Sequence, residues 1–511
     1  MGRKSILFQL GIEGHIPLAK RFRELFGLDI ACVTLTQEME RVLARQNGFS
    51  PDRHYSFPTF FKKNIGATEE LSLAALRERI HAHEKRWNIP SIVTFYYFDR
   101  YFRYVRDHAT VLRHVLLYMD FAAHILERED IAWNKGNLTT LFGLVMQSAC
   151  LARGIPSLKH RAACISGRIE FMDEASNGHL RGWRSVYRAL TLDSNTVAPE
   201  TVDEARAWLR AFRQRPNRPR YSEKNSVAEF DLAKFVRLLW QGVAVRFDPE
   251  YWAVLFGCPL DRRLGFRAPF GDAFLKDFLL REARAFGLRR SRWCREAVDL
   301  DQPFVYLPLH FTPEISTLTH GLRYEDQRLL VSNLAKYLPS GLVLYVKEHT
   351  SMPGRRPMRF YRDVAEHFNV RLIDPRVSTF DLIRKAKAVA TVTGTAGWEA
   401  FVFGKPVIVL GNVFFNEFPN VLHLNIDDDT AERIGNYLDN FEPNDREIER
   451  AVTAYFDTTY RAETGDIGVD VTDDEAAENA RRLADAFHDQ LTRFPLNRSR
   501  GPVIAASDGG E

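Results

Sequence analysis

The chain has 511 residues, of which 45% are hydrophobic and 27% charged, and its formal net charge is +4 at pH 7. This length exceeds what one ordinary hydrophobic core supports, so we expect two domains with additional helices. The balanced charge excludes a dedicated nucleic-acid-binding protein, and the even composition excludes a fibrous or low-complexity chain.

Cysteine usage and the absence of long apolar runs bear on the compartment. The five cysteines are widely spaced and form no CxxC pair, which predicts a reducing environment without a disulfide scaffold or zinc site. The N-terminal strand is too short for a signal sequence, and we find no run of about 18 consecutive apolar residues. We therefore expect a cytoplasmic protein, either free or attached peripherally to the inner face of the cell membrane.

The N-terminal part of the chain reads as an α/β domain over residues 1–195. A strand at 5–10, a glycine-bearing loop, a helix and a strand at 29–34 open it, and a helix at 111–126 leads to a second such unit at 131–158. Glu13 and His15 lie in the first loop, at the carboxyl end of the first strand. This position suits a general base, although loop polarity and helix capping explain the two residues equally well. The aromatic-rich piece at 94–104 is expected to pack in the core, with acceptor stacking as the alternative.

The middle of the chain, residues 196–300, reads as a helical linker or insert. It carries two basic islands, at 213–220 and 281–295. Such islands are typical of a solvated face, and contact with an anionic membrane surface or an acidic acceptor is the alternative.

Strands and helices alternate clearly over residues 301–425. Five buried strands are expected, at 304–307, 342–346, 370–373, 388–392 and 407–410. Helices between them predict a doubly wound parallel sheet, because right-handed crossovers of this length permit little else. Residues 426–495 read as C-terminal helices and residues 496–511 as a disordered tail.

Polar side chains follow three of these strands. Because the carboxyl ends of parallel strands share one edge of a sheet, we expect them to meet in one crevice. The turn before the predicted helix at 398–403 contains two glycines, and a helix N-terminus of this kind binds phosphate. The expected substrate-binding residues are His310, Glu314, Lys347, Glu348, His349, Thr393, Gly394, Thr395, Gly397 and Glu399.

These motifs resemble the capsule polysaccharide biosynthesis protein family, which includes Kdo transferases. The runs that carry the resemblance are VYLPLHFTPE, LYVKEH and TVTGTAGWEAFVFGKPVIVLG, with a weaker N-terminal likeness in AWNKGNLTT and ACLARGIPSL. The resemblance implies a GT-B-like α/β fold, in which two Rossmann-like lobes face a cleft. It also implies that the C-terminal lobe binds the nucleotide-sugar donor and the N-terminal lobe the glycan or glycolipid acceptor.

Related CMP-sugar enzymes carry a His-Pro pair and a later Ser/Thr motif at the donor phosphate. His349 matches the histidine, and Thr393 with Thr395 matches the hydroxyl motif, whereas Thr350 stands in place of the proline. The family's catalytic carboxylate has no motif match here.

The resemblance implies a nucleotide-sugar-dependent glycosyltransferase. The lysine, histidine, threonine and backbone N–H groups would stabilise the leaving phosphate, so no metal or other cofactor is required. Glu399 would accept hydrogen bonds from ribose hydroxyls, or else complement the helix dipole. A nucleotide-sugar epimerase, a polyol-phosphate transferase and a non-catalytic scaffold of polysaccharide assembly remain alternatives.

Overall fold

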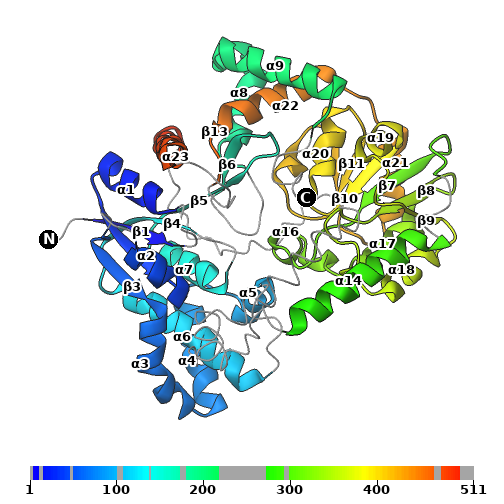
Figure 1. Ribbon diagram of the computed structural model, residues 1–511. Helices are drawn as coiled ribbons and strands as arrows, with labels where there is room; N and C mark the ends of the chain where they lie inside the picture. Colours follow the sequence, from blue (N-terminus) through cyan, green and yellow to red (C-terminus); the bar gives the residue numbers. More distant parts are fainter. Residues whose placement is uncertain are drawn as a thin grey trace. The chain divides into compact units, whose positions relative to one another are not determined.

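The computed structural model describes residues 4–10, 15–45, 50–99, 107–136, 140–172, 180–217, 272–292, 298–464 and 473–494. The chain divides into two compact units (Figure 1). Unit 1 comprises Met1–Val186 with Asp457–Glu511, and unit 2 comprises Tyr187–Phe456. The predicted limits at 195, 300, 425 and 495 remain predictions, and the two units divide the chain at other points. Helix α8 (Trp183–Leu192) spans the first boundary.

Unit 1 is built on a seven-stranded sheet with the order β13-β6-β5-β4-β1-β2-β3. Strands β3, β2, β1, β4 and β5 pair in parallel, whereas β6 and β13 add an antiparallel edge. The strands are β1 (Ser5–Gln9), β2 (Asp29–Thr34), β3 (Arg53–Ser56), β4 (Ile131–Lys135), β5 (Ser157–Ala162), β6 (Arg168–Met172) and β13 (Tyr460–Arg461).

Helices cover both faces of this sheet. On one face Phe22 packs edge-on against Trp133 and Phe487, with ring centroids 5.3 and 5.0 Å apart. These rings join the first helix, the sheet and the last helix in one core, so the C-terminal part of the chain completes the N-terminal unit. The helices are α1 (His15–Phe26), α2 (Gln37–Arg45), α3 (Phe57–Glu69), α4 (Leu73–Arg86), α5 (Ile92–Phe98), α6 (His108–Leu126), α7 (Leu141–Ala152) and α23 (Asp473–Arg493).

Helix α6 is the one helix of the described residues that is long and apolar enough to cross a membrane, judged by length and composition alone. The share of its apolar window buried inside the structure is 67%. Leu116, Leu117 and Met119 are fully buried. This burial is typical of the core helix of a globular unit.

Unit 2 contains a six-stranded parallel sheet with the order β12-β11-β10-β7-β8-β9. The strands are β7 (Phe304–Pro308), β8 (Val343–Lys347), β9 (Val370–Ile373), β10 (Ala388–Thr391), β11 (Val407–Val409) and β12 (Val421–His423). The chain runs outward from β7 to β9, returns to β10 beside β7, and runs outward again on the other side. This reversal is the strand order of a Rossmann sheet.

The two faces of the second sheet have separate cores. Leu334, Tyr361 and Ile434 pack with Leu307 and Val346 on one face, under α14, α17, α18 and α21. On the other face Trp398 of α20 contacts the rings of α9 and α22. The helices are α9 (Pro199–Gln214), α14 (Asp272–Arg290), α16 (Ile315–Leu318), α17 (Gln327–Tyr337), α18 (Met358–Ala365), α19 (Thr379–Lys385), α20 (Thr395–Val402), α21 (Thr430–Asp439) and α22 (Asp445–Thr458).

The predicted α/β class with two Rossmann-like lobes is confirmed, and five of the strands of unit 2 lie where they were expected. The sequence analysis missed β12, which makes this sheet six-stranded, and it missed β13 within the predicted C-terminal helices. Both strands are only two or three residues long, too short to show a periodic pattern. The predicted tail at 496–511 and most of the predicted linker lie outside the described residues.

Candidate functional site

The candidate site lies at the point where the strand order of the second sheet reverses, between β7 and β10. In open α/β sheets, ligands bind beyond the carboxyl ends of the strands at such a point. His310 follows β7 and Thr391 ends β10. The His310 Nε2 atom lies 3.3 Å from Thr391 Oγ1, so two of the three predicted strand ends meet through side chains.

His310 is a neutral, buried imidazole that holds the turn after β10. The Thr393 N–H donates to its Nε2 at 3.1 Å, so the neutral ring carries its proton on Nδ1. Burial lowers the pKa of His310 to about 3, and the charges of His349 and Arg356 act in the same direction. Its Nδ1 is buried and has no hydrogen-bond partner in the described part of the chain. The ring therefore has one nitrogen engaged by the protein and one donor left over.

The turn before α20 presents the N-terminus of that helix. The Gly394 N–H donates to Thr391 Oγ1 at 2.9 Å, which turns the chain into the helix. Gly394 is the N-cap residue and no side chain caps the helix. Thr393, Gly394 and Thr395 are half-buried, and the Thr395 hydroxyl makes no hydrogen bond to the residues that the structure describes. A helix N-terminus without a side-chain cap is suited to an anion.

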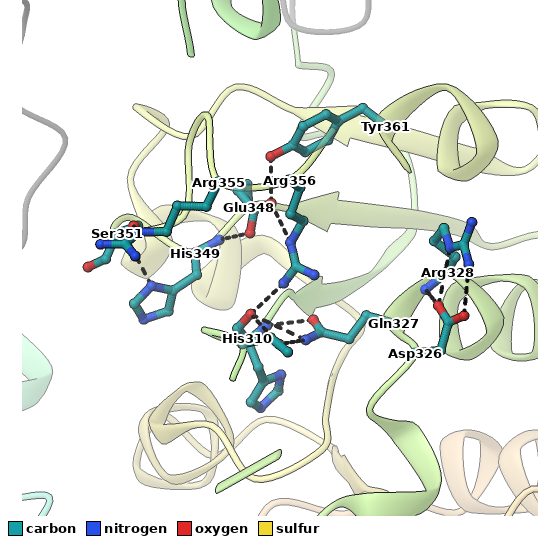
Figure 2. Close-up of polar contacts among 11 residues, drawn as sticks. His310, Asp326, Gln327, Arg328, Glu348, His349, Ser351, Arg355, Arg356 and Tyr361 are labelled. Carbon is teal, nitrogen blue, oxygen red and sulfur yellow. Dashed lines mark hydrogen bonds and ion pairs between the residues drawn. The ribbon is translucent and has the colours of Figure 1, made fainter. Parts of the chain in front are cut away.

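Glu348 lies inside the protein, at the centre of a hydrogen-bonded network (Figure 2). Its carboxylate accepts from Arg356 Nε at 2.9 Å, from the Tyr361 hydroxyl at 2.8 Å and from the His349 N–H at 2.7 Å. Arg356 also donates to the backbone carbonyl of His310 at 2.6 Å. Burial raises the pKa of Glu348, whereas Arg356, Tyr361 and the His349 N–H act in the opposite direction. This geometry gives Glu348 a positioning role, since all three donors come from the protein.

Lys347 and His349 flank Glu348 but point to different neighbours. Lys347 is 3% exposed, and its Nζ donates to the Val377 carbonyl at 2.5 Å and to the Thr379 hydroxyl at 2.8 Å. The lysine thus ties β8 to the segment before α19. His349 is half-buried, and its Nδ1 accepts from the Ser351 N–H at 3.2 Å. A neutral His349 therefore carries its proton on Nε2.

The remaining residues predicted for this site lie around α20 and after β7. Glu314 is exposed and accepts from the Ser316 hydroxyl at 3.1 Å. Gly397 is required by packing, because a Cβ there would lie 2.7 Å from the Phe415 ring, and its N–H already donates to the Gly394 carbonyl. Glu399 is 6% exposed within α20. Its predicted contact with ribose hydroxyls stays a prediction.

In unit 1, the first sheet has its own reversal point between β1 and β4. His15 is the first residue of α1 and is 7% exposed, and the Lys135 Nζ at the end of β4 lies 3.5 Å from its Nδ1. A neutral His15 that accepts from Lys135 carries its proton on Nε2, and its predicted role as a base stays a prediction. Glu13 lies outside the described residues.

Sequence reasoning missed four residues that shape the site. Gln327, at the start of α17, accepts from the His310 N–H at 2.7 Å and donates to the His310 carbonyl at 3.2 Å. Thr391, Arg356 and Tyr361 are the others. Arg356 is 8% exposed, and a buried arginine needs a partner, but the Arg-Arg pair at 355–356 does not reveal this burial in the sequence. Nothing in the sequence pattern marked Gln327 or Tyr361.

Comparison with known proteins adds sequence and structural likenesses. Protein FixF of Sinorhizobium fredii is 30% identical over 126 residues, which cover 23% of this chain and 29% of that protein. The chain therefore spans under a third of the length of this relative. Among solved structures, the Thermosulfurimonas dismutans KpsC beta Kdo 2,4 transferase gives a TM-score of 0.34 at 13% identity and covers 69% of this chain and 88% of that chain. The UDP-GlcNAc 2-epimerase of Neisseria meningitidis gives a TM-score of 0.24 at 12% identity. The match covers 96% of this chain and 100% of the epimerase chain.

A family comparison covers the candidate site itself. Residues 298–419 match the model described as "Capsule polysaccharide biosynthesis protein". This range contains β7, β8 and β10 with the residues that follow them. The resemblance predicted from the motifs is therefore confirmed, and this part of the chain carries the sequence pattern of the capsule polysaccharide biosynthesis family.

Proposed function

We propose that the protein is a glycosyltransferase of capsule or other surface polysaccharide biosynthesis. It transfers a sugar from a nucleotide-sugar donor to a glycan or lipid-linked acceptor. The observation that carries the proposal is the direct contact between His310, after β7, and the Thr391–Gly394 turn before α20. This contact lies at the reversal point of a Rossmann-ordered sheet, where nucleotide phosphates bind. The family match over the same residues supports the same class of reaction.

The leaving group of the transfer is the donor phosphate. As the bond from the anomeric carbon to the phosphate oxygen breaks, negative charge develops on that oxygen. The uncapped N-terminus of α20 and the Thr395 hydroxyl supply fixed donors for this charge. The neutral His310 holds this turn from the β7 side, because its Nε2 accepts from the Thr393 N–H. These groups are held by the fold before the donor binds, so they cost little reorganisation.

The hydrogen-bonded network around Glu348 holds the segment of His310 in place. Arg356 joins the Glu348 carboxylate to the His310 carbonyl, so the segments after β7 and β8 move as one piece. Acceptor activation needs a general base within hydrogen-bond reach of the acceptor hydroxyl. Glu13 and His15 remain the predicted candidates for this base.

The test is nucleotide binding by single variants. Wild-type protein is expected to be stabilised by one of CMP, UDP, GDP and ADP in a thermal-shift panel. The single variants Thr395→Ala and His349→Ala are each expected to bind that nucleotide more weakly. Thr201→Ala is the matched control, because Thr201 is a half-buried threonine in the first turn of α9 in the same unit. Unchanged affinity and transfer in both site variants would refute the donor-site assignment.

Incubation with a labelled donor separates the alternatives. A transferase needs an acceptor, whereas an epimerase converts the donor alone. A scaffold without a nucleotide site gives no thermal shift with any of the four nucleotides.

A further inference from the structure

The outer face of α14 combines exposed apolar side chains with arginines. Leu280 and Phe286 are 42% and 54% exposed, which is unusual for large apolar side chains. Ala283 and Arg290 are also exposed, and the four residues follow one another at spacings of three and four, so they form one stripe along the helix. The Arg290 guanidinium lies 5.2 Å from the centre of the Phe286 ring. The opposite side of α14 packs inside the protein, since Ala285 and Leu288 are buried.

The arginines of this region have no anionic partners among the residues that the structure describes. The five are Arg281, Arg284, Arg289, Arg290 and Arg292, and none makes an ion pair with any residue that the structure describes. Arginines elsewhere are commonly paired, as Arg481 is with Glu478 at 2.8 Å. Glu282 is the one acidic residue between Leu280 and Arg292. Positive charge is therefore concentrated without neutralisation.

Neighbouring elements extend the same charge. α14 packs against α18, whose Arg359 and Arg362 are exposed. Burial lowers the pKa of Arg355, just before α18, and the charge of Arg281 lowers it further. The two guanidinium groups therefore lie close enough to repel each other. Such repulsion disfavours this arrangement unless an external anion offsets it.

We propose that the outer face of α14, defined by Leu280, Ala283, Phe286 and Arg290, docks on an anionic lipid surface together with Arg292, two residues beyond the helix end. Unpaired arginines attract lipid phosphates, and an exposed aromatic ring in the same stripe inserts at the level of the headgroups. The apolar residues favour a membrane over a soluble polyanion, which offers nothing for Leu280 and Phe286 to enter. The inference does not depend on the proposed activity.

The test uses the full chain and vesicle flotation. Wild-type protein is expected to float with vesicles of equimolar phosphatidylcholine and phosphatidylglycerol but not with phosphatidylcholine alone, and salt should weaken the binding. Arg290→Gln with Arg292→Gln should lower the partition coefficient about thirtyfold, since each basic residue near an anionic surface contributes about 1 kcal/mol. Phe286→Ser should lower it with no change in charge.

Matched controls separate the surface from general effects. Arg481→Gln with Arg482→Gln removes the same charge from exposed, ion-paired positions on α23, and Leu192→Ser removes an apolar side chain that is 89% exposed on α8. Both controls should bind as wild type does, and circular dichroism should show all variants folded. Equal binding to neutral vesicles, or wild-type binding by the α14 variants, would overturn the proposal. Heparin binding as tight as vesicle binding and unaffected by Phe286→Ser would replace the membrane with a soluble polyanion, which also overturns it.

Discussion

Arg356→Met should destabilise the second unit strongly, because it leaves the Glu348 charge buried without its main partner. The Arg356 and Glu348 side chains are 10% and 1% exposed, and the Nε to Oε2 distance is 2.9 Å. Removing one member of such a pair costs about 3–5 kcal/mol. The variant also leaves the His310 carbonyl with one donor fewer. Replacing both members, as Glu348→Leu with Arg356→Met, should recover most of the loss, to within about 2 kcal/mol of wild type.

The effect should depend on pH with a defined sign. Burial already raises the pKa of Glu348, and loss of Arg356 removes a cause that lowers it, so the pKa rises further in the variant. A carboxyl whose pKa is raised on folding contributes stability that is present below its ordinary pKa and is lost as the pH rises through the folded pKa. The Arg356→Met protein should therefore lose more stability at about pH 8 than at about pH 5, because lower pH favours the neutral carboxyl of Glu348.

Urea denaturation at both pH values measures this, with the free-energy difference taken from the shift of the midpoint at constant slope. Hydrogen exchange of the segment after β7 supplies a local readout, since Arg356 holds the His310 carbonyl. A stability loss below about 1 kcal/mol, or an equal loss at both pH values, would contradict the assignment of Arg356 as the partner that keeps Glu348 ionised.

Three further predictions concern α20 and its neighbours. Thr395→Ala should weaken nucleotide binding about tenfold, measured by titration calorimetry, because the hydroxyl is a proposed donor to the nucleotide. The melting temperature should not change, because the hydroxyl does not cap α20. Gly397→Ala should cost about 1–3 kcal/mol in urea denaturation, because its Cβ would meet the Phe415 ring at 2.7 Å, whereas Gly435→Ala in α21 meets nothing within 4 Å and should be neutral or stabilising. NMR should find the His310 ring neutral down to about pH 3. The stability that the neutral ring contributes is fully present above about pH 6.5 and should decline as the pH falls toward 3. His310→Gln should lack this pH-dependent part of the stability. A His310 signal that titrates near its ordinary value would contradict the buried, neutral ring.

The strands of the second sheet could be predicted because each is a short apolar run bounded by turn residues. β7 and β10 were placed to within a residue or two. Leu329 of α17, in contrast, lies next to the buried Leu330 and is itself 56% exposed. A periodic pattern gives the apolar face of a helix only to within about one residue, because 3.6 residues per turn leaves positions at the margin.

The site was predicted in outline, since positions 310 and 393–394 do meet. The roles of Lys347 and Glu348 could not be foreseen, because a residue that follows a strand can enter the crevice or turn into the protein. Which of these happens depends on partners that have no fixed spacing in the sequence. Glu348 is buried because Arg356 and Tyr361 reach it from α18 and the segment before it.

The pairing of β13 with β6 has a consequence for the order in which the protein acquires its structure during synthesis. Unit 2 is one continuous stretch, so all of its strands leave the ribosome before the last part of unit 1 does. Until then the edge of β6 has no neighbour, and Phe22 and Trp133 lack the ring of Phe487. The nascent N-terminal unit thus displays an apolar surface while the middle of the chain is completed. A nascent chain that has emerged from the ribosome only as far as residue 456 should carry a folded unit 2 beside an N-terminal unit that recruits chaperones.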